Sequence, residues 1–434
     1  LWDDARALLV LQSFWLAAGA FPVYLLARKY LRSRGLAQGL AVLYLCQPGL
    51  MFANQFDFHF STLLFTPLLW ACYALEARDS RVYYVALLTG LACSETAPFS
   101  LIGLLPLVWQ RRGWRHALAT LVLALSFLGF SHQWIRWHNL GQSTQYAQLY
   151  SEYGGQSGGV VGHLLRHPVD SLNKLNTELN RKYLLEIFAP VAFVPWLAPL
   201  EMVPATPVML GNLLSWRESQ HTIRYHYTAG ILPFVMWATC LAWGRLERRM
   251  SVRKCSWLLV LACLIGLGVG PLHPEEWYPH EKHRRQALSD LRQLIPPEAS
   301  ISIDNTLGAT LSHRQQAYLF PNPIQRAAWG NRPQALVDQS VMGLNPLSPG
   351  AVRRSLEQCT VDYIISEPGA PGDFPLLRPD RTYLLSEICA APIYGPIYLK
   401  NGVAVFDRQK RYRVSPRVLP LPHWRPWWDH VFPF

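Results

Sequence analysis

Long apolar runs separated by short polar breaks dominate the chain up to about Leu272. Some of these runs approach the roughly 20 residues that an α-helix needs to cross a bilayer, and others are shorter. The pattern predicts a polytopic α-helical membrane domain over residues 1–272, with about eight to ten membrane segments. The expected segments are 6–27, 36–53, 61–75, 83–93, 97–109, 117–131, 184–199, 203–216, 227–244 and 255–272.

Basic residues gather in three of the polar breaks. These breaks are 28–34, 111–115 and 245–254. Because positive charge marks cytoplasmic loops, we place all three in the cytoplasm. The break at 54–60, the long loop 132–183 and the chain after Leu272 then lie on the outer side. This threading requires 184–216 to be a hairpin or a re-entrant pair, and its many prolines favour broken helices there.

Composition agrees with a membrane domain and argues against a nucleic-acid partner. Charged residues make up 16% of the chain, against about 25% in soluble domains. The formal net charge is +12, but much of the excess lies in clusters beside apolar runs, where the positive-inside rule expects it. The chain begins at Leu1 rather than Met, so we expect it to be a fragment that lacks its N-terminus, and we interpret Asp3 and Asp4 as charges at a helix start.

The chain after Leu272 is polar and alternates between helical and strand patterns. It predicts a small extracytoplasmic α/β domain over 273–434, ending in a stretch rich in Pro and Trp. Asn401-Gly402 between two apolar runs indicates a β-hairpin. The expected elements are helices at 283–295 and 349–359, strands at 299–303 and 361–366, and the hairpin at 396–408.

The eight cysteines are divided between the apolar part of the chain and the polar tail. Six lie in or beside apolar runs, where buried thiols are typical packing residues. Cys359 and Cys389 lie in the tail. An extracytoplasmic tail would allow these two to form a disulfide, and the sequence leaves the paired and the free state open.

The first candidate site is the polar break 54–60, which contains Asp57 and His59 between two apolar runs. Ionisable groups at the mouth of a membrane helix are costly unless they are hydrated, paired or functional. Asp57 could act as a general base or a metal ligand, and His59 as a ligand or a phosphate donor. The alternative is that Asp57 caps the helix near Phe60 and His59 extends to the membrane interface.

Two further groups are candidates. Glu95 lies between two short apolar runs, where a carboxyl group is either functional or paired. A second group lies at the outer end of segment 227–244 and consists of His221, Arg224, His226 and Tyr227. These side chains could bind a phosphate, and the arginine could do so through two parallel hydrogen bonds. The alternative is that they form a solvated loop at the membrane interface.

Two other features of the sequence do not indicate a specific function. The loop 132–183 contains several aromatic residues and the string GGQSGGVVG, and a flexible gating loop and a plain linker are equally consistent with it. Glu201, on the inner side in this threading, is interpreted as structural.

Several strings together resemble a bacterial membrane family known as domain of unknown function 2079 (DUF2079). That family is in turn similar to the GT-C glycosyltransferases. The strings are NQFDFHFSTLLFTPLL (54–69), LLTGLACSETAPFSLIGL (87–104), KYLLEIFAPVAFVPWLAPLEMVPATPVMLGNLLS (182–215), IRYHYTAGILPF (223–234) and IPPEASISIDNTLGATLSHRQQAYLFPNP (295–323).

The resemblance implies a multi-pass enzyme of the bacterial inner membrane. Such an enzyme moves a sugar from a polyprenyl-phosphate-linked donor to an extracytoplasmic acceptor, so membrane lipid and the lipid-linked sugar are the expected partners. A divalent metal is an open cofactor. The expected catalytic residues are Asp57 and Glu95, and the expected substrate-binding residues are His59, His221, Arg224, His226 and Tyr227.

One departure keeps two other functions in view. The resembled family often has Lys-Glu-Asp where this chain has Ser94-Glu95-Thr96, so Glu95 loses both charged neighbours. This loss favours the alternative of a non-catalytic membrane protein that binds a lipid or a partner subunit. A transporter is the third reading, because proline-broken helices suit one.

Overall fold

The chain divides into two compact units, Leu1–His273 and Pro274–Phe434, and each is described by itself. The computed structural model describes residues 6–138, 149–150, 153, 157–215, 217–272, 279–304, 307–308, 311–324, 349–368, 378–413 and 415–419. The Asp3-Asp4 pair and the Trp-rich end of the tail lie outside the described residues.

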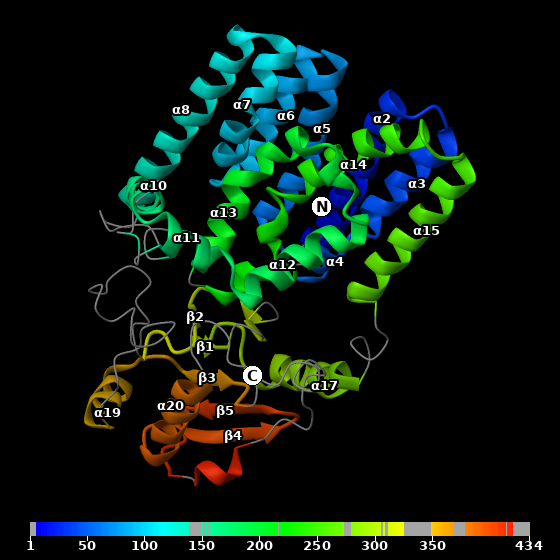
Figure 1. The fold of residues 1–434 in the computed structure, drawn as a ribbon. Helices are drawn as coiled ribbons and strands as arrows, with labels where there is room; N and C mark the ends of the chain where they lie inside the picture. The colour runs from blue at the N-terminus through cyan, green and yellow to red at the C-terminus, as the bar shows by residue number, and fades with distance from the viewer. Residues whose placement is uncertain are drawn as a thin grey trace. The chain divides into compact units, whose positions relative to one another are not determined.

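The first unit is helical (Figure 1). Its α-helices are α1 (Arg6–Ala18), α2 (Ala20–Tyr30), α3 (Arg34–Leu45), α4 (Pro48–Gln55), α5 (Phe65–Ala77), α6 (Ser80–Cys93), α7 (Ala97–Arg112), α8 (Trp114–His138), α10 (Ser157–Arg166), α11 (Pro168–Leu175), α12 (Glu178–Phe188), α13 (Thr206–Leu214), α14 (Leu232–Glu247) and α15 (Val252–Val269). Its 3-10 helices are η1 (Phe60–Leu64), η3 (Ala189–Val191), η4 (Val194–Leu197), η5 (Pro199–Ala205), η6 (Glu218–His221) and η7 (His226–Thr228).

The core of this unit is built around α14. This helix packs against α2, α5, η4 and η5, and it buries Trp237 and Trp243 almost completely. A helix that is apolar on all sides belongs inside a protein or a membrane. Gly244 allows α14 to approach α2 closely, since a Cβ atom there would lie 2.8 Å from the carbonyl oxygen of Tyr30.

Four of the described helical stretches are long and apolar enough to cross a membrane by length and composition. They are Arg6–Tyr30, Phe60–Ala77, Trp114–His138 and Val252–Val269. The count becomes five if α3 and α4, which meet at a bend of 44°, form one broken span. We expected about eight to ten segments. The difference arises because α6, α7 and α14 have only 14, 16 and 16 residues.

Two regions of the first unit differ in their helix content. Between α12 and α13 the chain forms only the short turns η3, η4 and η5, so the predicted helix breaks in 184–216 are confirmed. Proline lacks a backbone N–H and ends regular helices, which explains these breaks. The expected long loop 132–183 is different: α8 extends to His138, and α10, α11 and the start of α12 occupy most of its described part.

The second unit is a small α/β fold whose five-stranded sheet has the order β2-β1-β3-β5-β4. β1 pairs in parallel with β2 and β3, whereas β5 pairs antiparallel with β3 and β4. The strands are β1 (Ile301–Ile303), β2 (Ala317–Leu319), β3 (Tyr363–Ser366), β4 (Gly395–Lys400) and β5 (Val403–Asp407). The helices are α17 (Pro279–Leu294), α19 (Pro349–Gln358) and α20 (Arg378–Ala390), with the 3-10 turn η9 (Pro416–Val418).

The predicted hairpin at Asn401-Gly402 is confirmed. The two residues have φ angles of 52° and 79°, and they connect β4 to β5. Positive φ at both central positions is the requirement of the tight turns that match strand twist, and Asn-Gly meets it with little strain. The predicted helices and strands of this unit are also present, whereas β2 and α20 were not predicted.

A buried pair of charges joins α20 to the parallel strands. Asp304, directly after β1, accepts hydrogen bonds from Ser366 Oγ and Glu367 N, each at 2.7 Å. Arg381 Nε lies 3.9 Å from the same carboxyl group. Burial raises the pKa of Asp304, and Arg381 opposes that effect.

The two cysteines of the second unit are buried. Cys359 and Cys389 are both free thiols in this structure. They lie in the apolar cluster that α19 and α20 form with the sheet. Their role in this structure is packing.

Candidate functional site

The loop that contains Asp57 and His59 connects α4 to η1 and is held in place by α1. The backbone N–H of His59 donates to Gln12 Oε1 at 3.2 Å. Gln12 is fully buried, and its Nε2 donates to the carbonyl oxygen of Ala53 at 3.2 Å. A polar side chain on α1 therefore fixes the backbone on which the candidate residues stand.

This loop meets the turn at residues 224–227, although the two are far apart in the sequence. The imidazole rings of His59 and His226 are stacked, with centroids 4.3 Å apart and planes at 21°. We call this pair the histidine stack. Phe56 extends it, stacking on His59 at 5.2 Å and meeting the ring of Tyr225 edge-on at 5.1 Å. The structure thus joins two candidate groups that the sequence presents separately.

His226 is the more buried member of the stack. Burial lowers its pKa from 6.5 to about 3, and the neighbouring His59 and Arg217 add to the effect. The side chain is therefore neutral near pH 7. Its Nδ1 atom is buried and has no hydrogen-bond partner among the described residues.

Cationic and hydroxyl groups lie in the same segment as His226. Arg217 Nη1 donates to Tyr227 Oη at 3.5 Å, and the charge of Arg217 helps to lower the pKa of His226. The guanidinium of Arg224 lies 5.4 Å from the ring centre of Phe52 and interacts with the carboxyl group of Glu186. The ring of Tyr227 is 4.4 Å from that of His226. Guanidinium, phenol and imidazole groups at one place are suited to binding phosphate oxygens.

Asp57 differs from these neighbours in being exposed. Its backbone oxygen lies 3.2 Å from His59 Nδ1, which sets the shape of the loop. No side-chain hydrogen bond or ion pair is recorded for its carboxylate within the described part of the chain. The carboxylate therefore remains accessible beside the stack, as a general base or a cation ligand must be.

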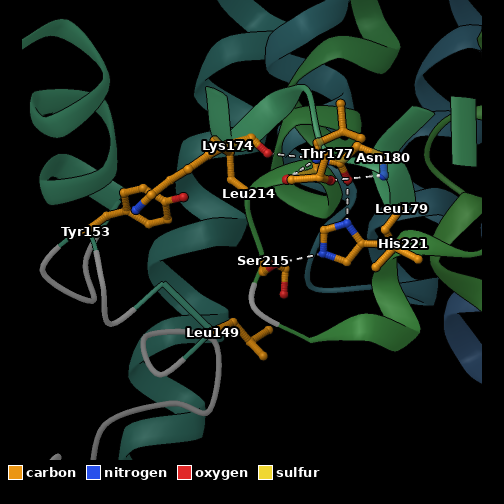
Figure 2. A pocket seen from close by; sticks show the side chains of 10 residues that line it. Leu149, Tyr153, Lys174, Thr177, Leu179, Asn180, Leu214, Ser215 and His221 are labelled. Carbon is orange, nitrogen blue, oxygen red and sulfur yellow. Dashed lines mark hydrogen bonds between the residues drawn. The ribbon is translucent and has the colours of Figure 1, made fainter. Parts of the chain in front are cut away.

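His221 belongs to a different place in the first unit. Its Nδ1 is 2.5 Å from Asn180 Oδ1, and its Nε2 is 2.7 Å from the carbonyl oxygen of Ser215 (Figure 2). The amide of Asn180 is oriented by its Nδ2, which donates to the carbonyl oxygens of Lys174 and Leu213. Both ring nitrogens of His221 are thus engaged within the protein, so its expected role as a phosphate ligand stays a prediction.

A cavity of about 290 Å³ lies beside His221. Figure 2 shows side chains that line it, which come from Leu149, Tyr153, α11, α12 and the end of α13. Four of its ten lining residues are leucines, and the other six are Tyr153, Lys174, Thr177, Asn180, Ser215 and His221. The ammonium group of Lys174 lies 4.5 Å from the ring centre of Tyr153.

Glu95 occupies the junction between α6 and α7 and is half-buried. Its neighbours close a small turn, since Ser94 Oγ and Thr96 Oγ1 are 2.9 Å apart and Thr96 N donates to Ser94 Oγ. The 3-10 helix η1, which follows His59, packs against α6 and η7. Glu95 therefore directly follows a helix that packs against η1, and its catalytic role stays a prediction.

Glu201 is buried and pairs with Arg111, as expected for a structural residue. Arg111 also pairs with Glu76, and its guanidinium lies 4.6 Å from the ring centre of Trp237. We call Glu76, Arg111 and Glu201 the arginine cluster. It ties α5, α7 and η5 to the central helix α14.

No group of three or more His, Cys, Asp or Glu residues that could hold a metal ion occurs within the described ranges. The structure adds three residues that the sequence analysis did not single out, namely Gln12, Asn180 and Arg217. Gln12 gives a signal in the sequence, because it is a polar residue inside an apolar run; Asn180 and Arg217 give none.

The apolar helices of the first unit are typical of helical membrane proteins. The sequence comparison agrees with this class, since residues 1–360 match the family described as "Predicted membrane protein (DUF2079)". The chain therefore belongs to the DUF2079 family and is a membrane protein. The comparison with curated proteins gives no match.

Proposed function

We propose that this protein transfers a sugar from a polyprenyl-phosphate-linked donor to an acceptor hydroxyl, with the histidine stack at the reaction site. One observation carries the proposal. The 4.3 Å contact between His59 and His226 joins the loop of the exposed carboxylate Asp57 to the turn of Arg224 and Tyr227. A base and a set of phosphate-binding groups are the two components that such a transfer requires.

In the proposed reaction Asp57 accepts the proton of the acceptor hydroxyl while its oxygen attacks the anomeric carbon of the sugar. A new carbon–oxygen bond forms, and the bond from the anomeric carbon to the phosphate oxygen breaks. The electron pair of that bond leaves with the polyprenyl phosphate. Arg224 and Arg217 offset the charge that develops on the phosphate, and Nδ1 of His226 supplies one further hydrogen bond.

We place this reaction on the extracytoplasmic face of a bacterial inner membrane. The support is the charge of the breaks at 28–34, 111–115 and 245–254, which favours the cytoplasm for all three. The loop of Asp57 lies at the opposite end of α5 from Asp79, which caps α6 near the basic break at 111–115. The second unit would then be extracytoplasmic.

The test uses the full chain in lipid nanodiscs with a polyprenyl-phosphate-linked hexose, and measures the polyprenyl phosphate released. Asp57→Asn should lower turnover at least about 100-fold, because it removes the general base. Its fold should be unaffected, since Asp57 is exposed.

The matched control is Asp79→Asn. Asp79 is also exposed and caps α6 with its carboxylate, and Asn caps helices equally well. This variant should turn over as fast as the wild type. A folded wild type that releases no carrier, or an Asp57→Asn variant with full turnover, would overturn the proposal.

A second candidate function is non-catalytic lipid binding. The observation that favours it is the 2.9 Å contact between the hydroxyl groups of Ser94 and Thr96. The two side chains that flank Glu95 therefore bond to each other. Saturable binding of polyprenyl phosphate without any sugar release in the same assay would support this candidate over the enzyme.

A further inference from the structure

The distance between two exposed tryptophans on α8 matches the thickness of a bilayer. Only 11% of its most apolar window is buried. Trp114 near its start and Trp134 near its end are 59% and 50% exposed. The two residues are twenty positions apart, which corresponds to about 30 Å in an α-helix and equals the hydrocarbon thickness. Since Trp favours the two membrane interfaces, the C-terminal end of α8 lies at an interface.

A chain of contacts brings α11 to the same end of the first unit. α7 packs against α8, with Gly113 as the single residue between them. Near the start of α7, Ser100 Oγ donates to the carbonyl oxygen of Gly230 at 3.5 Å, and Val208 of α13 also lies beside Gly230. α13 in turn contacts α11. Figure 1 shows α10 and α11 at the end where α8 finishes.

α11 is amphipathic, and part of its apolar surface is exposed. On its inner side Ser171 is buried, and Leu175 packs against the core. On its outer side Val169 and Leu172 are 71% and 65% exposed. Leu165, at the end of α10, is 78% exposed. Leu165, Val169 and Leu172 therefore contribute little to folding and present an apolar surface that water does not stabilise. We call these three residues the outer leucine face.

The charges beside this face are mainly basic. Arg166 is exposed next to Leu165, and Lys174 follows Leu172. His163 and Lys174 lie 3.3 and 3.7 Å from the carboxylate of Asp170. The first turns of α12 add the acidic Glu178 and the basic Arg181 and Lys182. An amphipathic helix with apolar residues on one side and basic residues along it is typical of a helix that lies in a membrane interface.

We infer that α10 and α11 form an interfacial hairpin that lies in the headgroup layer of the membrane. The outer leucine face is inserted at the boundary with the acyl chains, and Arg166 binds the phosphates of anionic lipids. The occupant of this surface is therefore lipid, and the inference does not rest on the proposed transfer reaction. Its consequence is that the cavity beside His221, which α11 lines with Lys174, opens next to the membrane interface.

The test measures the collision of a nitroxide label with oxygen, which concentrates in lipid, and with a water-soluble nickel chelate. Cysteine is placed in turn at Leu165, Val169 and Leu172 of the full chain in vesicles that contain phosphatidylglycerol. Seven of the eight native cysteines are buried, and labelling of the wild type gives the background. Leu125→Cys on α8 serves as the lipid reference, and Glu298→Cys in the second unit as the water reference.

At all three positions the oxygen-to-nickel ratio should exceed that of the water reference by about threefold or more, as at the lipid reference. A ratio equal to that at Glu298 would show that the face is in water and overturn the inference. Low collision with both reagents would show that protein covers the face, and would overturn it as well.

The choice of lipid tests the role of Arg166. Replacing the anionic vesicles by pure phosphatidylcholine should lower the oxygen-to-nickel ratio at Val169. The reason is that Arg166 would then face lipid headgroups with no net charge instead of anionic ones. In an Arg166→Gln chain the ratio should be the same in both vesicles. An equal response of the two chains would contradict the assigned role of Arg166.

Discussion

The arginine cluster and the histidine stack both place ionisable groups between helices of the first unit. The two places differ in whether these groups have bonding partners inside the protein. Arg111 lies between the carboxylates of Glu76 and Glu201 and over the ring of Trp237. Its charge is matched entirely inside the protein. In the histidine stack the buried Nδ1 of His226 has no partner among the described residues, and Asp57 is exposed beside it.

This difference distinguishes ionisable groups that stabilise the fold from ionisable groups that can bind a ligand. A group whose partners are all within the fold stabilises the fold, and removing one partner leaves the others uncompensated. A group that keeps its bonding capacity reduces stability slightly, and a ligand can restore the lost interaction. The following predictions test whether the two places differ in this sense.

The largest expected effect is that of Arg111→Met. This change leaves Glu76 and Glu201 facing each other without a cation, and should lower the free energy of unfolding by about 3–5 kcal/mol. Denaturant titration in detergent measures it. Arg115→Met is the control, because Arg115 is exposed and its loss should change the free energy by less than about 0.5 kcal/mol. Equal effects of the two changes would remove the structural role of the arginine cluster.

Asn180→Ala should follow. Asn180 is fully buried, and its loss leaves His221 Nδ1 and the carbonyl oxygens of Lys174 and Leu213 without their partner. The free energy of unfolding should fall by about 2–3 kcal/mol. The exposed Asn173 gives the control Asn173→Ala, for which the same titration should show almost no change. A loss that is as small for Asn180 would mean that water satisfies the site.

The pH dependence of stability should report on His226. The folded protein keeps this side chain neutral, with a pKa lowered from 6.5 to about 3, whereas the unfolded chain takes up a proton below pH 6.5. Its stabilising contribution is therefore complete above pH 6.5 and is lost as the pH falls toward 3, by at most about 1.4 kcal/mol per pH unit.

Unfolding titrations at pH 7.5 and 5.5 test this effect. The wild type should lose more stability between the two values than His226→Phe, which keeps an aromatic ring in the stack and cannot titrate. All other groups are common to the two chains, so their contributions cancel. Identical losses would show that His226 does not titrate differently in the folded and unfolded states.

The smallest effect is expected for Phe56→Leu. It removes the ring contacts at 5.2 Å with His59 and at 5.1 Å with Tyr225 but keeps an apolar side chain. The free energy of unfolding should fall by about 1 kcal/mol. Thermal unfolding in detergent is sensitive enough to detect it, and an unchanged or higher melting temperature would show that the loop does not need this ring.

The sequence predicts the local features of this fold well, because their causes are local. Apolar runs become helices, the prolines of 184–216 break them, and Asn401-Gly402 makes the hairpin turn. β2 was missed because its three residues are a strand only through pairing with β1. The helices in 132–183 were missed because α10 and α11 have only 10 and 8 residues, which is too short for a clear helical period in the sequence.

The candidate site shows the same limit more sharply. Asp57 and His59 stand out locally, as do His226 and Tyr227, but nothing in either string indicates that the two strings touch. Their contact depends on Gln12, which holds the first loop from α1. The separation of His221 from this group depends on Asn180, whose partner could not be predicted from the sequence.

The central claim is that the histidine stack and its arginines bind a phosphate carrier. The most direct measurement is the affinity of polyprenyl phosphate for the full chain in nanodiscs, for the wild type, Arg224→Gln and Arg248→Gln. Arg248 is exposed at the far end of α14 from the stack. Arg224→Gln should weaken binding about tenfold or more, because it removes a charge-assisted hydrogen bond, and Arg248→Gln should bind like the wild type. Equal affinities of all three chains would contradict the account.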